Sequence, residues 1–139
     1  MANVGIFISF DFDRDEELHR SFYSQADGGD SKHNIEDCSL NEPYRPEKTN
    51  EWTKKAEEQI KKSDIVIVIV RDDTHSSRGV IIEVDIAKRL HKPIFQIRPK
   101  KATAGPVKGI DKLIPWKWKR IDVEIDELLG YGDSECRLP

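Results

Sequence analysis

The stretch that most constrains the fold is a run of branched aliphatic residues, DIVIVIV, at residues 64–70. Branched side chains favour extended backbone, and a run without polar interruption predicts a strand that is covered on both faces. Such strands are typical of parallel sheets, which have helices on either side. The run is much shorter than the roughly 20 apolar residues that a membrane-spanning helix needs. It therefore predicts the central strand of an α/β domain.

Segments with strand and helix patterns alternate along the chain. Further strands are expected at 4–10, 35–40, 92–98 and 113–121. Helices are expected over 11–26, from Asn50 with Trp52, Ala56 and Ile60 on the inner face, over 78–91 and over 123–130. This alternation predicts three layers around a five-stranded parallel sheet, in the flavodoxin-like order 2-1-3-4-5. The 139 residues suffice for one domain, which we place at 1–130, with a loose C-terminal tail at 131–139.

Composition limits the compartment and the class of partner. The net charge of −3 argues neither for nor against nucleic acid. Cys38 and Cys136 form no CxxC pair and no cluster with histidine, which favours a reducing compartment and predicts no metal site. The N-terminal apolar run is interrupted at Ser9 and Asp11 and has no basic segment before it, so it is expected to be a strand and not a signal peptide. We therefore expect a cytoplasmic protein that does not bind a membrane.

A basic segment near the C-terminus raises the alternative of nucleic-acid binding. Residues 98–120 hold eight Lys or Arg against one acid, and Trp116 and Trp118 alternate with lysines. Basic residues between aromatic ones indicate nucleic-acid binding in some proteins. An edge strand with its tryptophans inward and its lysines preventing strand pairing explains the same pattern. We favour the edge strand and expect no nucleic-acid partner.

One acidic residue falls on a helix face that is otherwise apolar. In the helix predicted at 78–91 the apolar side chains fill an arc of roughly 200°, and Glu83 lies near its centre. An unpaired buried carboxylate is strongly unfavourable or takes up a proton. Two structural explanations are a salt bridge to Arg14, Arg71 or Arg78, and a local unwinding that exposes the side chain. The functional explanation is a carboxylate directed at a ligand pocket.

Three polar segments follow predicted strands and meet at one edge of the expected sheet. They are SFDFD at 9–13, CSL at 38–40 and RDDTHSS at 71–77. Ligands of sheets with this strand order bind at the carboxyl ends of the strands. The helix that carries Glu83 begins at the same edge, so the sequence predicts a ligand site there.

The same segments carry a resemblance to a known family. FISFDFDRD at 7–15, DCSL at 37–40 and the pattern TxSSxxVxxExxxA from Thr74 to Ala87 stand in register along the chain. In this respect the chain resembles the TIR-like proteins of Thoeris anti-phage systems. The resemblance implies a TIR-like fold and an enzyme, an NAD nucleosidase similar to ADP-ribosyl cyclases. It also identifies Glu83 as the catalytic residue.

The resemblance further implies how such a protein acts. NAD is the substrate and no cofactor is needed; nicotinamide is released, and a cyclised ADP-ribose signal goes to a separate effector. Self-association is expected on activation. Gly79 stands where the resemblance predicts a bulky aromatic residue, so the site is expected to be larger or looser there.

The candidate residues suit this chemistry. Breaking the nicotinamide–ribose bond builds positive charge on the ribose, which a nearby carboxylate stabilises. Phe10 suits stacking on a flat ring and core packing equally well. Ser77 and Asp13 also suit the start of a helix, where capping and the helix dipole favour them. The residues expected to bind NAD are Ser9, Phe10, Asp11, Asp13, Ser39, Thr74 and Ser77.

Three other functions can be compared with these residues. A non-catalytic TIR-like module that binds a nucleotide, or assembles with copies of itself, fits the whole pattern, and the other two fit only parts of it. A phospho-receiver domain would use the acids at 11–13, but its Ser or Thr at the end of strand four is replaced by Arg98, and Glu83 has no role in it. A metal-dependent nuclease would use the same acids, but no second acidic cluster follows with clear spacing.

Overall fold

The computed structural model describes residues 3–40, 42–71, 74, 77–100, 102, 105–107, 109–110 and 112–130, without the side chains of Asp13 and Arg14. The elements along the described chain are β1 (Asn3–Ser9), α1 (Phe12–Asp27), β2 (Asn34–Asp37), η1 (Pro46–Lys48), α2 (Thr49–Lys62), β3 (Ile65–Ile69), α3 (Arg78–Arg89), β4 (Ile94–Arg98), β5 (Leu113–Pro115) and α4 (Trp118–Leu129). The tail predicted at 131–139 lies outside these residues. None of these helices is long and apolar enough to span a membrane.

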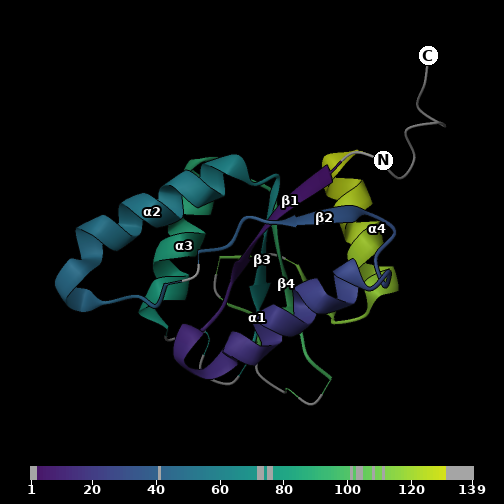
Figure 1. Cartoon of the computed structure of the whole chain (residues 1–139), viewed down its shortest axis with the longest axis horizontal. Coiled ribbons are helices and arrows are strands. Elements are labelled where there is room, and N and C mark those ends of the chain that lie inside the picture. The colour runs from purple at the N-terminus through teal and green to yellow at the C-terminus, as the bar shows by residue number, and fades with distance from the viewer. Residues whose placement is uncertain are drawn as a thin grey trace.

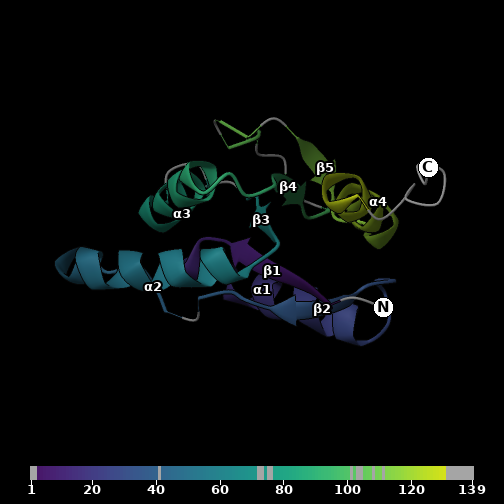
Figure 2. The same ribbon diagram turned by 90° about the horizontal axis from the view of Figure 1, so that it is seen from above.

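The five strands form one parallel sheet in the order β2-β1-β3-β4-β5, which confirms the predicted topology. β3 lies in the middle, and all of its residues are buried. Helices cover both faces of the sheet, α1 and α4 on one side and α2 and α3 on the other (Figures 1 and 2). The branched run is therefore enclosed on both faces, as its composition predicts.

Alternate residues of the strands fill two apolar layers. On one side Ile8 packs in a layer with Phe22 of α1. On the other side Phe7 packs in a layer with Ile86 of α3. Because side chains alternate across a sheet, Ser9 lies on the same face of β1 as Phe7 and is directed toward α3.

Several boundaries differ from the prediction. The strand predicted over 113–121 ends at Pro115, and helix α4 begins at Trp118. Proline has no backbone donor for continued pairing, so the strand is short. The second strand, predicted over 35–40, ends at Asp37. The helix predicted to be capped by Asn50 begins one residue before it, directly after the turn η1.

The two tryptophans of the basic segment face the interior, but not from an edge strand as predicted. The rings of Trp116 and Trp118 lie 6.0 and 4.7 Å from that of Phe22, measured between centroids. Both indole nitrogens donate to Gln25 Oε1, at 3.0 and 2.7 Å. These contacts fix the start of α4 against α1 and give the two rings a packing role.

Candidate active site

A cavity of about 420 Å³ lies at the carboxyl ends of β1 and β2. It is lined by residues 10–12 after β1, by residues 40, 42–44 and 46 after β2, by Trp52 of α2, and by residues 77–79 and Glu83 of α3. Its volume falls in the range of small-molecule sites. The position is the edge that the strand order predicts for a ligand.

Glu83 forms a buried part of the cavity wall. The residue is 6% exposed, and its Oε1 accepts a hydrogen bond of 2.7 Å from Ser9 Oγ. Burial raises the pKa of the Glu83 carboxyl to about 8, and the hydrogen bond from Ser9 opposes this only in part. A carboxyl with this pKa is mainly protonated at neutral pH and ionises more readily when a cation lies beside it.

The structural explanations for Glu83 can be compared with its contacts. α3 is a regular helix at this position, so no unwinding exposes the side chain. Among the described side chains, no arginine pairs with Glu83. Arg71 Nη1 lies 3.7 Å from Asp15 Oδ1, and Arg78 lies elsewhere on the cavity wall. In the described part of the chain, the partner of Glu83 is the hydroxyl of Ser9, and the side chain of Arg14, the third arginine considered, lies outside that part. Because a neutral hydroxyl cannot balance a negative charge, the carboxyl is poised to respond to a cationic ligand.

The residues after β1 form an aromatic wall. Phe10 is buried, and its ring stacks on His19 and on Phe12, with centroids 4.7 and 5.5 Å apart. Phe10 therefore packs in the core and also lines the cavity. Phe12 lines the cavity too and is less buried, so it presents more of its ring to a ligand than Phe10 does.

The two acidic candidates of this segment lie at the start of α1. Asp11 is the N-cap residue, and its carbonyl accepts a hydrogen bond from Asp15 N at 2.8 Å. Asp11 also lines the cavity. Asp13 lies in the first helical turn, where acidic residues are favoured. Its side chain is outside the described part of the structure.

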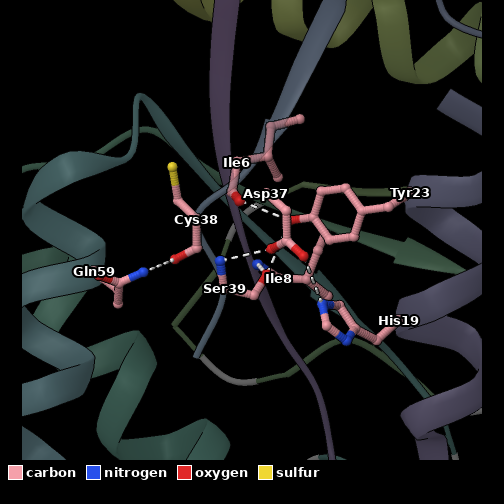
Figure 3. Close-up of polar contacts among 8 residues, drawn as sticks. All are labelled: Ile6, Ile8, His19, Tyr23, Asp37, Cys38, Ser39 and Gln59. Atoms are coloured by element: carbon pink, nitrogen blue, oxygen red, sulfur yellow. Dashed lines mark hydrogen bonds and ion pairs between the residues drawn. The ribbon is translucent and has the colours of Figure 1, made fainter. Parts of the chain in front are cut away.

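Ser39 and Thr74 do not line the cavity, contrary to the prediction. Ser39 Oγ accepts a hydrogen bond of 2.9 Å from Ile8 N and contacts the hydroxyl of Tyr23 (Figure 3). Thr74 Oγ1 accepts a hydrogen bond of 2.7 Å from Arg71 N. Both hydroxyls are buried, and buried polar atoms are usually satisfied by such local partners.

The other two predicted serines, Ser77 and Ser9, lie near the cavity but differ in their contacts. Ser77 is the N-cap of α3 and accepts a hydrogen bond of 3.5 Å from Val80 N, as its capping interpretation predicts. It also lines the cavity. Ser9 is fully buried, and its hydroxyl donates to Glu83. Ser9 is therefore placed to position the carboxyl, while Ser77 is placed to meet a ligand.

The opposite wall was missed from the sequence. Tyr44 and Trp52 line it edge to face, with centroids 5.2 Å apart, and Trp52 Nε1 donates to the carbonyl of Glu42 at 3.0 Å. Gly79 lies against this wall, and a Cβ at this position would lie 3.2 Å from Tyr44 Cβ, which is a tight contact. The place expected to be loose is thus occupied by aromatic rings. The sequence shows a tyrosine between two prolines in NEPYRP. No local pattern indicates that this loop returns to α3.

Ser9→Ala should raise the pKa of Glu83 further, because the lost hydrogen bond favours the ionised carboxyl. The free energy of unfolding should fall by about 1 kcal/mol, the usual value of a hydrogen bond. Carbon-13 NMR titration of the carboxyl and a thermal melt measure the two effects. Ser21→Ala, on the exposed side of α1, is the matched control. An unchanged Glu83 titration in Ser9→Ala contradicts the positioning role.

A solved structure with a similar fold is the CMP N-glycosidase BcmB of Clostridium botulinum. The two chains are 20% identical, and the similarity covers 88% of this chain and 98% of that chain, with a TM-score of 0.50. This likeness supports the fold. Among curated proteins, none matches this chain.

The sequence itself matches a family. The family model of the TIR-like domain of the Thoeris protein ThsB matches residues 7–104, which is more than half of the chain. The matched region contains the cavity-lining segments from Phe10 to Glu83. The chain therefore belongs to the ThsB TIR-like family of Thoeris systems.

Proposed function

We propose that this chain cleaves the N-glycosidic bond of a nucleotide, and that NAD is its substrate. It releases nicotinamide and makes a cyclised ADP-ribose signal for a separate effector, in antiviral defence. It acts in the cytoplasm without a cofactor and self-associates when activated. The observation that carries the proposal is the Glu83 carboxyl, buried in the wall of a cavity lined by aromatic rings.

The proposed reaction breaks the bond between ribose C1′ and N1 of nicotinamide. The electron pair of this bond goes to N1 and neutralises the cationic ring, while positive charge develops on the ribose. A Glu83 carboxylate beside C1′ stabilises that charge, as carboxylates do in glycosidases. Attack on C1′ by a nitrogen of the adenine gives the cyclised product, and attack by water gives ADP-ribose and one proton.

The rest of the cavity suits the other parts of a dinucleotide. Phe12 on one wall, and Tyr44 and Trp52 on the other, offer apolar surfaces for flat rings. Arg78 lies on the cavity wall in the first turn of α3, where the backbone amides of a helix start also favour anions. This end of the cavity therefore suits the phosphates.

A nucleotide with a neutral base is the second candidate, because the structurally similar BcmB is a CMP N-glycosidase. Cleavage of the two candidate substrates needs opposite protonation states of Glu83. Nicotinamide leaves as a neutral molecule, so its release needs the carboxylate. A neutral base leaves as an anion unless an acid protonates it, so its release needs the protonated carboxyl.

The experiment measures nicotinamide release from NAD and cytosine release from CMP between about pH 6 and pH 9. For NAD, kcat/KM should rise with pH through about 8, the pKa of Glu83 in the empty cavity. Cleavage of CMP that falls above that pH supports the second candidate instead.

A crystal structure with NAD or ADP-ribose soaked in separates catalysis from binding alone. If neither substrate is cleaved but a ribose faces Glu83, the chain is a nucleotide-binding module. A nucleotide bound away from Glu83 excludes both forms of the proposal.

A further inference from the structure

Among the described residues, no strand pairs with the outer edge of β2. β2 is the last strand in the order and pairs with β1. Cys38 N donates to Ile6 O of β1 at 2.9 Å, so the backbone groups of residues 36 and 38 face β1. Because these groups alternate in direction, Ile35 and Asp37 direct theirs to the open edge. Such an edge can accept an extended segment of another chain.

A groove of about 710 Å³ runs beside this edge, between β2 and α1. Phe12 and Asp27, the two end residues of α1, both line it. On β2 it is lined by Ile35 and Asp37, which lie on the same face of the strand. A helix of this length extends about 22 Å, which is the length of a strand of about six or seven residues. The groove therefore has the length of a short extended segment of about six or seven residues.

The groove carries net negative charge. Its ionisable lining includes the acids Glu16, Asp27 and Asp37 and the base Arg20. Arg20 Nη1 donates to Glu16 Oε1 at 2.8 Å, so these two charges balance each other. The other two acids lie at opposite ends of the groove, because α1 and β2 run in opposite directions. A partner that spans the groove is therefore expected to be basic.

Asp37 is held rigidly at one end. Its Oδ1 accepts a hydrogen bond of 2.8 Å from Ser39 N, and its Oδ2 lies 3.7 Å from Nε2 of the buried His19 (Figure 3). Burial acts to raise the pKa of Asp37, but the contacts with His19 and Ser39 outweigh it and lower the pKa below its usual value. The carboxylate is thus ionised at neutral pH and stays partly exposed.

The side chains of Asp37 and His19 are close but not hydrogen-bonded. A separation of 3.7 Å is too long for a hydrogen bond, and His19 Nε2 has no hydrogen-bond partner in the described part of the chain. This atom is buried at the wall of the groove.

We propose that the groove between α1 and β2 binds an extended, basic segment of a partner protein. The segment pairs with the backbone of Ile35 and Asp37 and places a lysine or arginine on the Asp37 carboxylate. A small cation would use Asp37 but neither the length of the groove nor the open backbone groups. The inference does not depend on the proposed NAD cleavage, because the test below measures binding and not turnover.

The probe is a six-residue peptide of alternating valine and lysine, with blocked ends and a fluorophore. Two control peptides isolate the two kinds of contact: one has glutamate in place of lysine, and one keeps lysine but carries N-methyl groups on alternate amides. Fluorescence anisotropy should show binding of the first peptide. The two controls should bind at least about tenfold more weakly, since each lacks one kind of hydrogen bond or charge contact.

The matching variants are Asp37→Asn and Asp27→Asn. Each should weaken binding of the basic peptide, Asp37→Asn by about tenfold, because a hydrogen bond to a charged group is lost. Asp27 is exposed at the other end of the groove, so its variant tests the proposal even if Asp37→Asn folds poorly. Asp85→Asn is the control with the same charge change, since Asp85 lies exposed on α3 on the other side of the sheet.

Three results would overturn the proposal. One is no binding of the basic peptide to the wild-type protein up to about 1 mM. Another is equal binding of the N-methylated peptide, which would reduce the interaction to non-specific charge attraction. The third is a dimer of this chain that the peptide displaces, which would make a second copy the occupant in place of a partner protein.

Discussion

Glu83→Gln should lower NAD cleavage by at least about 100-fold, since each loss of about 1.4 kcal/mol of transition-state stabilisation slows a reaction tenfold. The amide keeps the shape of the side chain and still accepts the hydrogen bond from Ser9. It carries no charge to stabilise the developing ribose cation. Nicotinamide release should be measured near pH 9, where the wild-type carboxyl, with its pKa of about 8, is ionised.

The control for this experiment is Glu58→Gln, which makes the same change at an exposed position of α2. Turnover by the control should equal that of the wild-type protein. Intact turnover by Glu83→Gln would end the catalytic interpretation, whatever the stability of the variant. Wild-type activity that is high near pH 6, falls toward pH 9 and is lost in the Gln variant at pH 6 would instead favour an acid role for the residue.

The second large effect is on stability as a function of pH. The pKa of Glu83 is about 8 in the folded protein and near 4.5 in the unfolded chain. Between these values the folded state holds a proton that the unfolded state has released, so wild-type stability falls as the pH rises. The loss should reach about 5 kcal/mol above pH 8 and be absent below pH 4.5.

Glu83→Gln should not show this dependence. Its free energy of unfolding should match that of the wild type near pH 4.5 and exceed it increasingly up to pH 8. Urea unfolding of both proteins at a series of pH values measures the difference. A Gln variant that is less stable than the wild type at pH 8 would show that the carboxylate is held by a favourable charge partner and would contradict the account of its burial.

The sequence predicts the sheet and the place of Glu83 because both depend on strict periodicity. The branched run of β3 specifies a strand enclosed on both faces, and the helical phase of α3 directs Glu83 into the molecule. The alternation of β1 then brings Ser9 to the same layer. In these cases one regular backbone geometry decides where a side chain points.

The parts that the sequence does not predict lie in loops and at element ends. Ser39 and Thr74 follow strands, but their hydroxyls bond to nearby backbone groups and not to the cavity. Tyr44 reaches the cavity through a proline-containing loop and lies there against Gly79, which is distant in the sequence. Hydrogen bonds between neighbouring residues, and the packing of loops against distant residues, have no repeating sequence pattern from which they can be predicted.

The hydrogen bond between Ser9 and Glu83 joins residues 74 positions apart, so burial of the carboxyl depends on the docking of α3 against β1. The carboxyl is buried where α3 packs on the layer to which β1 contributes. In a partly folded chain with α3 undocked, Glu83 is in water and ionised at neutral pH. Docking of α3 at neutral pH therefore takes a proton from solvent. The packing of α3 that closes the cavity is therefore favoured at lower pH through Glu83.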